Sequence, residues 1–212
     1  NGIHHHYSSD KLKPGFTPAY FDLLVKGSSP EKLPLASGQT TERLIAEISP
    51  VIFDEKLFPR KVEQSTGADM VAESASNFYE GVTQKEVEDF YAAKATPNDL
   101  RPVSLGLNSK IVKINGKLVE EVYKSGGKYG IAIDSIVSWL GKAASVAETE
   151  SQKKELGLLM GYYKSGDLKS WDEYNVVWAQ NSEPMIDYIN GFIETYEDPM
   201  GMKATWEAIV NY

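Results

Sequence analysis

Hydrophobic positions in the first hundred residues recur mainly at helical spacing. One helix is predicted after Thr17, whose side chain can cap the first turn, and another is expected to begin at Thr40 or Thr41. We expect this second helix to stop before Pro50, because a proline inside a helix removes a backbone hydrogen bond. A capping-box pattern at Thr83–Glu86 predicts a third helix. The first part of the chain is therefore expected to be helical, with long irregular connections.

The pattern changes to an extended one after Pro97 and Pro102. Residues 110–114 and 117–123 flank Asn115-Gly116, a dipeptide typical of a type I′ turn, and they predict a β-hairpin. Three helical patterns follow, over residues 131–147, 150–164 and 167–180. The order of helices, hairpin and helices predicts an α+β fold with a small antiparallel sheet and surrounding helices.

The last thirty residues predict a second hairpin around the turn Asp198-Pro199-Met200-Gly201. Aromatic and β-branched residues on both limbs suit a half-buried sheet. A hairpin centred on Met200 and Gly201 pairs Glu194 with Glu207, and strand alternation then puts Tyr196 on the same face as Glu194. Two like charges directly opposite each other destabilise a sheet, so folding alone does not explain them.

A bound cation would remove this repulsion. We therefore hypothesise that Glu194 and Glu207 form a receptor for an ammonium group, with the phenol of Tyr196 beside it. Two alternatives stay open: the glutamates are unrelated solvated residues, or the two acids serve sugar hydrolysis. A bulge at Asn190-Gly191 or in the turn would instead place the two carboxylates on opposite faces.

Composition and charge narrow the class of partner. The chain has 212 residues and a net charge of -8, which argues against nucleic acid or an anionic membrane as the partner. No apolar run is long enough for a transmembrane helix. The absence of cysteine excludes disulfides and thiolate metal sites within the chain. We expect residues 1–212 to form one lobe, with a sub-boundary near 97–103 as an alternative division.

Motifs for a self-contained active site are missing. The sequence contains no Gly-rich phosphate loop, no G-x-S-x-G elbow and no H-E-x-x-H helix. All three histidines are adjacent, at His4, His5 and His6, and neighbouring side chains point in different directions, so they do not make a preorganised metal site. Both ends of the chain read as cuts through a longer protein.

Several motifs in the second half of the chain resemble one family of zinc exopeptidases. The pattern F-I-E-S/T-Y-x-D-P-x-G, which here runs from Phe192 to Gly201, is similar to that of the dipeptidyl peptidase III family, especially its bacterial, Bacteroides-like members. The start of the chain also resembles this family, which makes the histidines native sequence. The further segments that carry the resemblance are Gly2–Tyr7, Asp10-Lys11, Gly166–Leu168, Tyr174-Asn175, Trp178, Ile189–Gly191 and Trp206-Glu207.

The resemblance implies a role for each candidate residue. Glutamates at the positions of Glu194 and Glu207 hold the free α-amino group of a peptide, and the tyrosine at the position of Tyr196 hydrogen-bonds the scissile region and helps to stabilise the oxyanion. Anchoring the amino terminus at a fixed distance from a metal lets such an enzyme release dipeptides. The resemblance also implies a cytoplasmic location and an oligopeptide substrate.

The family's zinc motif, H-E-x-x-G-H with a further Glu, does not occur in this chain. The resemblance therefore implies a substrate-binding lobe with a small or partial β-barrel, whose partner is a zinc-bearing helical lobe of the same polypeptide. The cofactor of the parent enzyme is zinc bound outside this chain, so we expect the chain alone to be inactive. The alternative is a non-catalytic peptide-binding or scaffold module that uses the same hairpin.

Overall fold

The computed structural model describes residues 3–212, so Asn1 and Gly2, the latter part of the family-like start, lie outside the described residues. The chain divides into two compact units, Asn1–Ala75 and Ser76–Tyr212. The division lies upstream of the change in sequence pattern at 97–103. That segment is a connection inside the second unit, because strand β1 (Tyr79–Glu80) on one side of it pairs with strand β2 (Ser109–Ile114) on the other.

The first unit is built from short helices. Helix α1 (Pro18–Lys26) has the predicted cap, in which the Thr17 side chain accepts a hydrogen bond from the Tyr20 backbone N–H. Helix α2 (Thr41–Phe53) does not stop before Pro50, as the sequence predicted, but continues for one more turn. The Asp54 backbone N–H donates to Pro50 O at 2.9 Å, so the proline loses its own donor while its carbonyl still supports the helix. The two remaining elements of this unit are η1 (Pro30–Lys32) and α3 (Met70–Glu73).

The three histidines lie in different environments within the first unit. His4 is buried, and its Nε2 lies 2.9 Å from Phe58 O. His5 and His6 are exposed, and their rings stack on each other. Among residues 3–212 no three histidine, aspartate or glutamate side chains gather in a way that could hold a metal ion.

The second unit begins with a small sheet of order β1-β2-β3. Strands β2 and β3 (Lys117–Val122) form the predicted antiparallel hairpin, and both turn residues, Asn115 and Gly116, have positive φ, as a type I′ turn requires. The short strand β1 pairs with β2 in parallel. Helix α4 (Gln84–Ala92) makes the crossover, and an ion pair of 2.6 Å between Lys113 and Glu86 ties it to β2.

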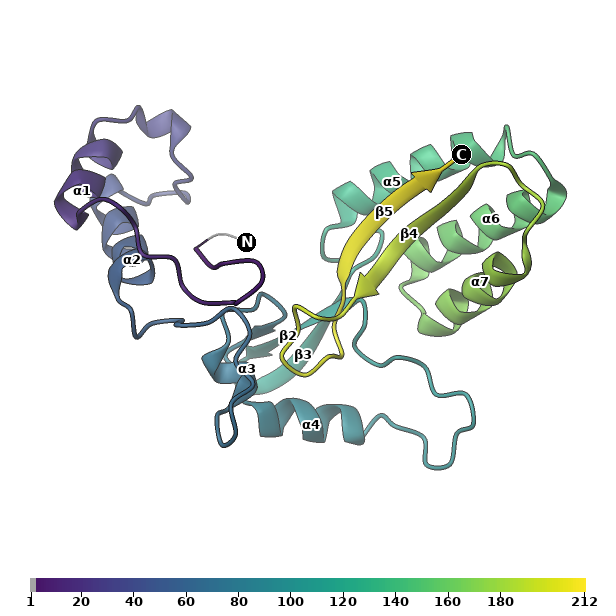
Figure 1. Ribbon diagram of the computed structural model, residues 1–212, viewed down its shortest axis with the longest axis horizontal. Helices are drawn as coiled ribbons and strands as arrows, with labels where there is room; N and C mark the ends of the chain where they lie inside the picture. The colour runs from purple at the N-terminus through teal and green to yellow at the C-terminus, as the bar shows by residue number, and fades with distance from the viewer. Residues whose placement is uncertain (1–2) are drawn as a thin grey trace. The chain divides into compact units, whose positions relative to one another are not determined.

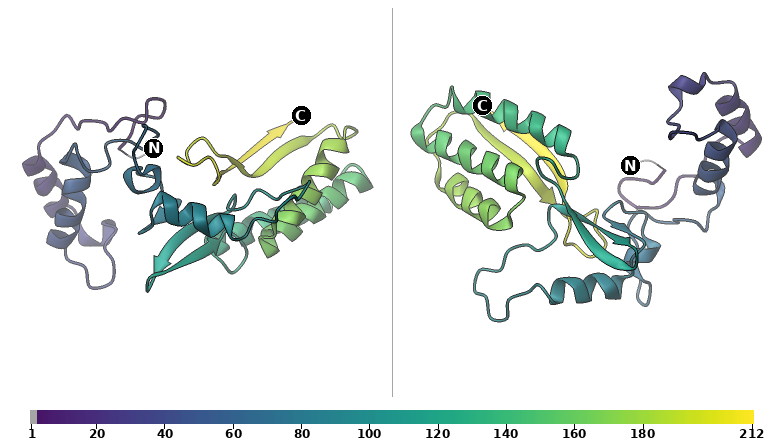
Figure 2. Two further views of the ribbon diagram at one scale, coloured as in Figure 1. Left: turned by 90° about the horizontal axis from the view of Figure 1, so that it is seen from below. Right: turned by 180° about the vertical axis from the view of Figure 1, so that it is seen from behind.

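Three helices and a second hairpin complete this unit. Helices α5 (Gly130–Ala144), α6 (Glu150–Ser165) and α7 (Leu168–Gln180) match the predicted ranges within a few residues. Strands β4 (Asp187–Glu194) and β5 (Thr205–Asn211) form an antiparallel pair, and the helices cover one of its faces (Figures 1 and 2). The fold is therefore α+β, as the sequence predicted.

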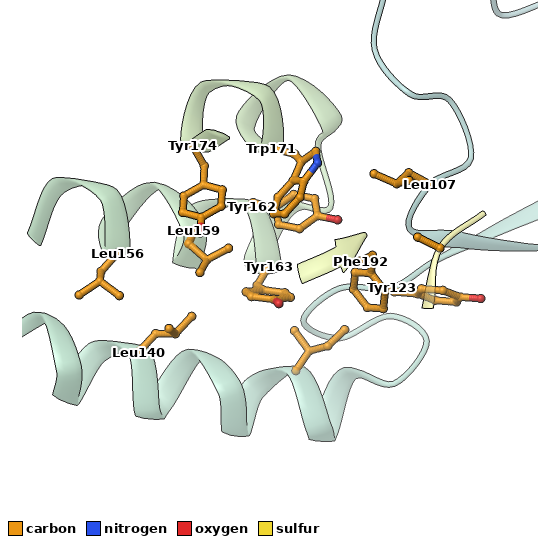
Figure 3. Packing of buried hydrophobic residues seen from close by; sticks show 12 residues of the cluster. Leu107, Tyr123, Leu140, Leu156, Leu159, Tyr162, Tyr163, Trp171, Tyr174 and Phe192 are labelled. Carbon is orange, nitrogen blue, oxygen red and sulfur yellow. The ribbon is translucent and has the colours of Figure 1, made fainter. Parts of the chain in front are cut away.

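The core of the second unit lies between helices α5, α6 and α7 and the parts of the two hairpins near Tyr123 and Phe192 (Figure 3). Aromatic rings dominate it: Trp171 lies 4.9 Å from the Tyr162 ring and 5.3 Å from the Tyr174 ring, measured between centroids. Tyr123, which follows β3, packs on Phe192 of β4 at 5.1 Å. Trp171 and Tyr174 of helix α7 are thus part of the core. Its contact with β4 fixes the second hairpin to the helices.

We expect Thr83→Ala to destabilise the second unit by about 1 kcal/mol, because it removes a helix cap. The capping box of α4 is complete: Thr83 Oγ1 accepts from the Glu86 backbone N–H, and a Glu86 carboxylate oxygen accepts from the Thr83 backbone N–H at 3.0 Å. Urea denaturation followed by tryptophan fluorescence checks this, because all four tryptophans lie in this unit. Thr83→Ser keeps the hydroxyl and should change the midpoint little.

Candidate functional site

The register of the second hairpin differs from the predicted one. Glu207 lies opposite Gly191, and Glu194 lies opposite Thr205, so the two glutamates are not a directly opposed pair. The prediction was wrong because it assumed a tight hairpin centred on Met200 and Gly201. The strands instead end at Glu194 and resume only at Thr205, and a connecting loop of residues 195–204 sets the register.

A β-bulge nevertheless brings the two carboxylates to one face. The pairing shifts by one residue between Phe192 and Glu194, which leaves Ile193 as the extra residue. Without this shift, strand alternation would place Glu194 and Glu207 on opposite faces. With it, Glu194 shares the side of Thr205, and therefore also the side of Glu207 two residues further along the strand. The two glutamates are diagonal neighbours, a relation in which long side chains can reach each other.

Contacts with α6 identify the face that carries them. The Tyr163 hydroxyl donates to Asn190 Oδ1, and Trp206 Nε1 donates to the same hydroxyl oxygen at 2.8 Å, so Asn190 and Trp206 point toward the helices. Glu207 follows Trp206 in the strand and points the other way. Glu194 and Glu207, both half-buried, therefore lie on the face of the hairpin opposite to that of Asn190 and Trp206.

Helix α7 supports strand β4 close to these residues. Trp178 Nε1 donates to Tyr188 O at 2.9 Å, so the helix runs along the strand. Further on, the Trp171 ring packs directly on Gly191, where a Cβ would lie 2.8 Å from Trp171 Cζ3. The glycine opposite Glu207 is therefore required by packing, and it is not the bulge that its sequence suggested.

Tyr196 lies outside the strand. The sequence put it on the face of Glu194 by strand alternation, but β4 ends at Glu194 and Tyr196 belongs to the loop, so alternation does not apply. Its side chain is 71% exposed. The predicted turn is present at the tip of this loop, where the Gly201 backbone N–H donates to Asp198 O at 2.9 Å and Gly201 has a φ of 65°. The structure thus places a phenol in the loop between the two glutamate-bearing strands.

Two buried charged residues fix this loop, and sequence reasoning missed both. The Asp198 carboxylate accepts from the backbone N–H groups of Met202 and Lys203 at 2.8 and 2.7 Å, and from the Tyr79 hydroxyl of β1 at 3.0 Å. Lys203 is fully buried, and its Nζ donates to the Tyr91 hydroxyl of α4 at 2.7 Å. It also lies 3.2 Å from Ser109 Oγ in β2. Lysine is usually exposed, and nothing in the sequence around Lys203 indicates that this side chain is buried.

The surroundings of Lys203 change the pKa of several groups. Burial lowers the pKa of Lys203 to about 8, against the opposing effect of Glu120 and Asp198. Burial opposes ionisation of Glu120, but hydrogen bonds from Lys94, Ser109 and Tyr91 outweigh it and hold its pKa below the ordinary value. Burial, helped by the charge of Asp198, raises the pKa of Tyr79. This cluster is a hydrogen-bonded network of opposite charges.

Glu194 and Glu207 differ from these groups, since the described part of the chain provides no ion pair for either carboxylate. Carboxylates without a cation of their own can accept hydrogen bonds from an ammonium group. A metal would need further ligands, and the described residues provide no such group around the pair. The arrangement suits recognition of an amine.

No helix among the described residues is both long and apolar enough to cross a membrane.

Comparison with known proteins places the second unit in a family. The model of peptidase family M49 matches residues 83–212. Dipeptidyl peptidase 3 of Rattus norvegicus and that of Homo sapiens are each 27% identical to this chain over 84 residues, which is 40% of the chain and 11% of the relative. The Dictyostelium discoideum protein is 26% identical over 99 residues, 14% of its length. The matched stretch is therefore a small part of these relatives.

Solved structures show the same fold. Dipeptidyl peptidase III from Caldithrix abyssi superimposes with a TM-score of 0.52 at 20% identity and covers 91% of this chain and 34% of that one. The enzyme from Corallococcus sp. strain EGB gives 0.51 at 18% identity, with 91% and 33% covered. The family model extends over more than half of the chain and includes both glutamates, Tyr196, Asp198 and Lys203. This chain belongs to peptidase family M49.

Proposed function

We propose that this chain is the substrate-binding lobe of a zinc-dependent dipeptidyl peptidase, and that it anchors the free α-amino group of an oligopeptide. Glu194 and Glu207 accept hydrogen bonds from the ammonium group, and Tyr196 donates to the peptide near the bond to be cut. The observation that carries the proposal is the pair of half-buried carboxylates on one face of the hairpin, with no cation of the described chain paired to either.

Family membership supports this assignment over sugar hydrolysis. A peptidase family model covers the hairpin and both glutamates, whereas two acids on a sheet are compatible with either chemistry by residue type alone. Binding energy from the anchored amino terminus would position the second peptide bond for cleavage. The names and lengths of the relatives support the remaining parts of the proposal, which are an oligopeptide substrate and a partner lobe in the same polypeptide.

The residues of this chain do not fit the zinc of the proposed enzyme. Zinc needs three or four histidine, cysteine or carboxylate ligands, and residues 3–212 provide no such group. The metal, if bound, would supply a Lewis acid and an activated water from another part of the parent polypeptide. We therefore assign to this chain only the holding and orienting of the peptide.

The proposal is tested by comparing tetra-alanine with N-acetyl-tetra-alanine in calorimetric titrations of this chain. We expect the free peptide to bind at least about tenfold more tightly, because acetylation removes the ammonium charge and its hydrogen bonds. Mass spectrometry of the same mixtures with added zinc should detect no dialanine. Equal affinity for the two peptides would refute the amine receptor. A parent polypeptide that binds the peptide but never cleaves it would favour the scaffold module.

A further inference from the structure

Asp198 and Lys203 are the two most buried charged side chains of the described residues, and both belong to the loop that carries Tyr196. Asp198 is 1% exposed and Lys203 is 0% exposed. Burying charges is costly unless they are paired and hydrogen-bonded, so an exposed loop would not need either of them. Their burial therefore has to be explained by what they hold in place.

Asp198 organises the loop from inside. Its carboxylate accepts from the backbone N–H groups of Met200, Met202 and Lys203, at 3.3, 2.8 and 2.7 Å. These three bonds close the chain around one side chain, so the path of residues 198–203 is determined by a single carboxylate. The Tyr79 hydroxyl then connects that carboxylate to β1.

Lys203 attaches the closed loop to the first sheet. Its Nζ donates to Tyr91 Oη at 2.7 Å and to Gly106 O at 3.3 Å, and it lies 3.2 Å from Ser109 Oγ. Glu120 of β3 accepts from Tyr91 at 2.8 Å and from Ser109 at 2.7 Å, so the ammonium group faces a carboxylate through two hydroxyls. Beside it, the Ala204 backbone N–H donates to Leu107 O at 2.9 Å.

We propose that Asp198 and Lys203 are positioning residues that hold Tyr196 in the orientation in which its hydroxyl reaches the bound peptide. This inference rests on the proposed function. Tyr196 itself is exposed and lies only two residues from the anchored Asp198. A phenol on a loop that moves freely would contribute little to binding, because ordering it would cost conformational entropy. Because Asp198 and Lys203 order the loop when the chain folds, this conformational entropy is lost before the peptide binds.

A double-mutant cycle tests the inference with tetra-alanine as the probe. In the wild-type chain, Tyr196→Phe should weaken binding several-fold. In Lys203→Met, which keeps the length of the side chain but loses its charge, Tyr196→Phe should have almost no further effect. Asp198→Asn is a second, milder background with the same expectation. Lys117→Met, at an exposed lysine of the β2–β3 hairpin, is the control and should leave the effect of Tyr196→Phe unchanged.

Amide hydrogen exchange gives a readout that does not depend on the peptide. Amides of residues 196–203 should exchange at least tenfold faster in Lys203→Met and Asp198→Asn, while those of Tyr162 and Tyr163 in the core should keep their protection. Unchanged exchange in the loop of both variants would overturn the inference. An effect of Tyr196→Phe that persists undiminished in both backgrounds would also overturn it. If Tyr196→Phe has no effect in the wild type, the proposed role of Tyr196 fails first.

The pH dependence of the wild-type loop needs no variant. Burial lowers the pKa of Lys203 to about 8, whereas an exposed lysine has a pKa of roughly 10.4. Between these values the opened loop binds more protons than the closed one, so raising the pH favours the closed loop. The neighbouring groups that face Lys203 are Asp198, Glu120, Lys94, Tyr79 and Tyr91. Burial opposes ionisation of Glu120, but hydrogen bonds from Lys94, Ser109 and Tyr91 keep its pKa below the ordinary value, and burial raises the pKa of both tyrosines.

Loop protection, corrected for intrinsic exchange, should therefore rise between pH 8 and pH 10, by as much as about tenfold per pH unit. Lys203→Met should lack this rise. A wild-type loop whose protection falls over the same range would show that Lys203 does not control closure, and would overturn the inference.

Discussion

Replacing Glu194 or Glu207 with glutamine is expected to weaken binding of a free-amino peptide by roughly ten- to a hundredfold. A hydrogen bond to a charged group contributes about 1.5–3 kcal/mol, and each 1.4 kcal/mol is a factor of ten in affinity. Affinity for the N-acetylated peptide, which offers no ammonium group, should hardly change. Titration calorimetry of the two variants against both peptides measures this difference.

Stability separates this effect from simple damage to the hairpin. The two carboxylates are neighbours on one face and repel each other, so either glutamine should leave the free energy of unfolding unchanged or slightly increase it. Glu183→Gln, at an exposed glutamate before β4, removes the same charge elsewhere and serves as the control. If both site variants bound the free peptide like the wild type, the receptor assignment would be wrong.

The same substitution, glycine to alanine, is expected to have opposite effects at two positions of the second unit. At Gly191 a Cβ would collide with the Trp171 ring, which is itself held among other core aromatics. Forcing extra atoms into a packed core costs about 1–3 kcal/mol. The strand would have to move away from α7, and peptide binding should fall with stability because Glu207 lies directly opposite.

At Gly157, in the middle of α6, a Cβ meets nothing within 4 Å. Alanine in a helix interior is more favourable than glycine by about 0.5–1 kcal/mol, so Gly157→Ala should stabilise the protein by that amount. Urea denaturation followed by tryptophan fluorescence compares the two variants directly. A destabilised Gly157→Ala or a neutral Gly191→Ala would show that local packing around these glycines differs from the structure described.

Local chemistry allowed the sequence to predict most of the elements. Thr17, Thr83 and Asn115-Gly116 each act through their nearest neighbours, and the helix caps and the type I′ turn are where the sequence placed them. The predicted end of α2 was wrong. A proline near the end of a helix removes only one backbone hydrogen bond, and packing can outweigh that loss. Boundaries of this kind depend on tertiary contacts that a local pattern does not contain.

The geometry of the site was harder to predict than its residues. Glu194, Glu207 and Tyr196 were identified by residue type and by family resemblance, but their relation depends on the register, and register depends on the bulge and on the length of the loop. A pairing shift of one residue changes the face of every side chain after it. The predicted pairing of Glu194 with Glu207 was wrong, but the bulge still places these two residues on one face.

Asp198 and Lys203 could not be identified as buried from sequence. Their partners Tyr79, Tyr91 and Ser109 lie about a hundred residues earlier in the chain, and no periodic pattern links such distant positions. The division between Ala75 and Ser76 likewise has no counterpart in the hydrophobic spacing. Strand β1 has only two residues, and its parallel pairing with β2 is a contact across α4 that hydrophobic spacing does not report.

The bulge at Ile193 makes the shared face of the two glutamates depend on strand register. If Ile193 paired with Thr205 in place of Glu194, Glu194 would turn to the face of Asn190 and Trp206 although no charged group had been changed, whereas deletion of Ile193 would leave Glu194 opposite Thr205. Substitutions in the loop leave that register intact, so the carboxylate pair and the phenol are fixed by separate parts of the chain. In the course of evolution, selection could therefore alter the hold on the amino terminus and the placement of Tyr196 one at a time.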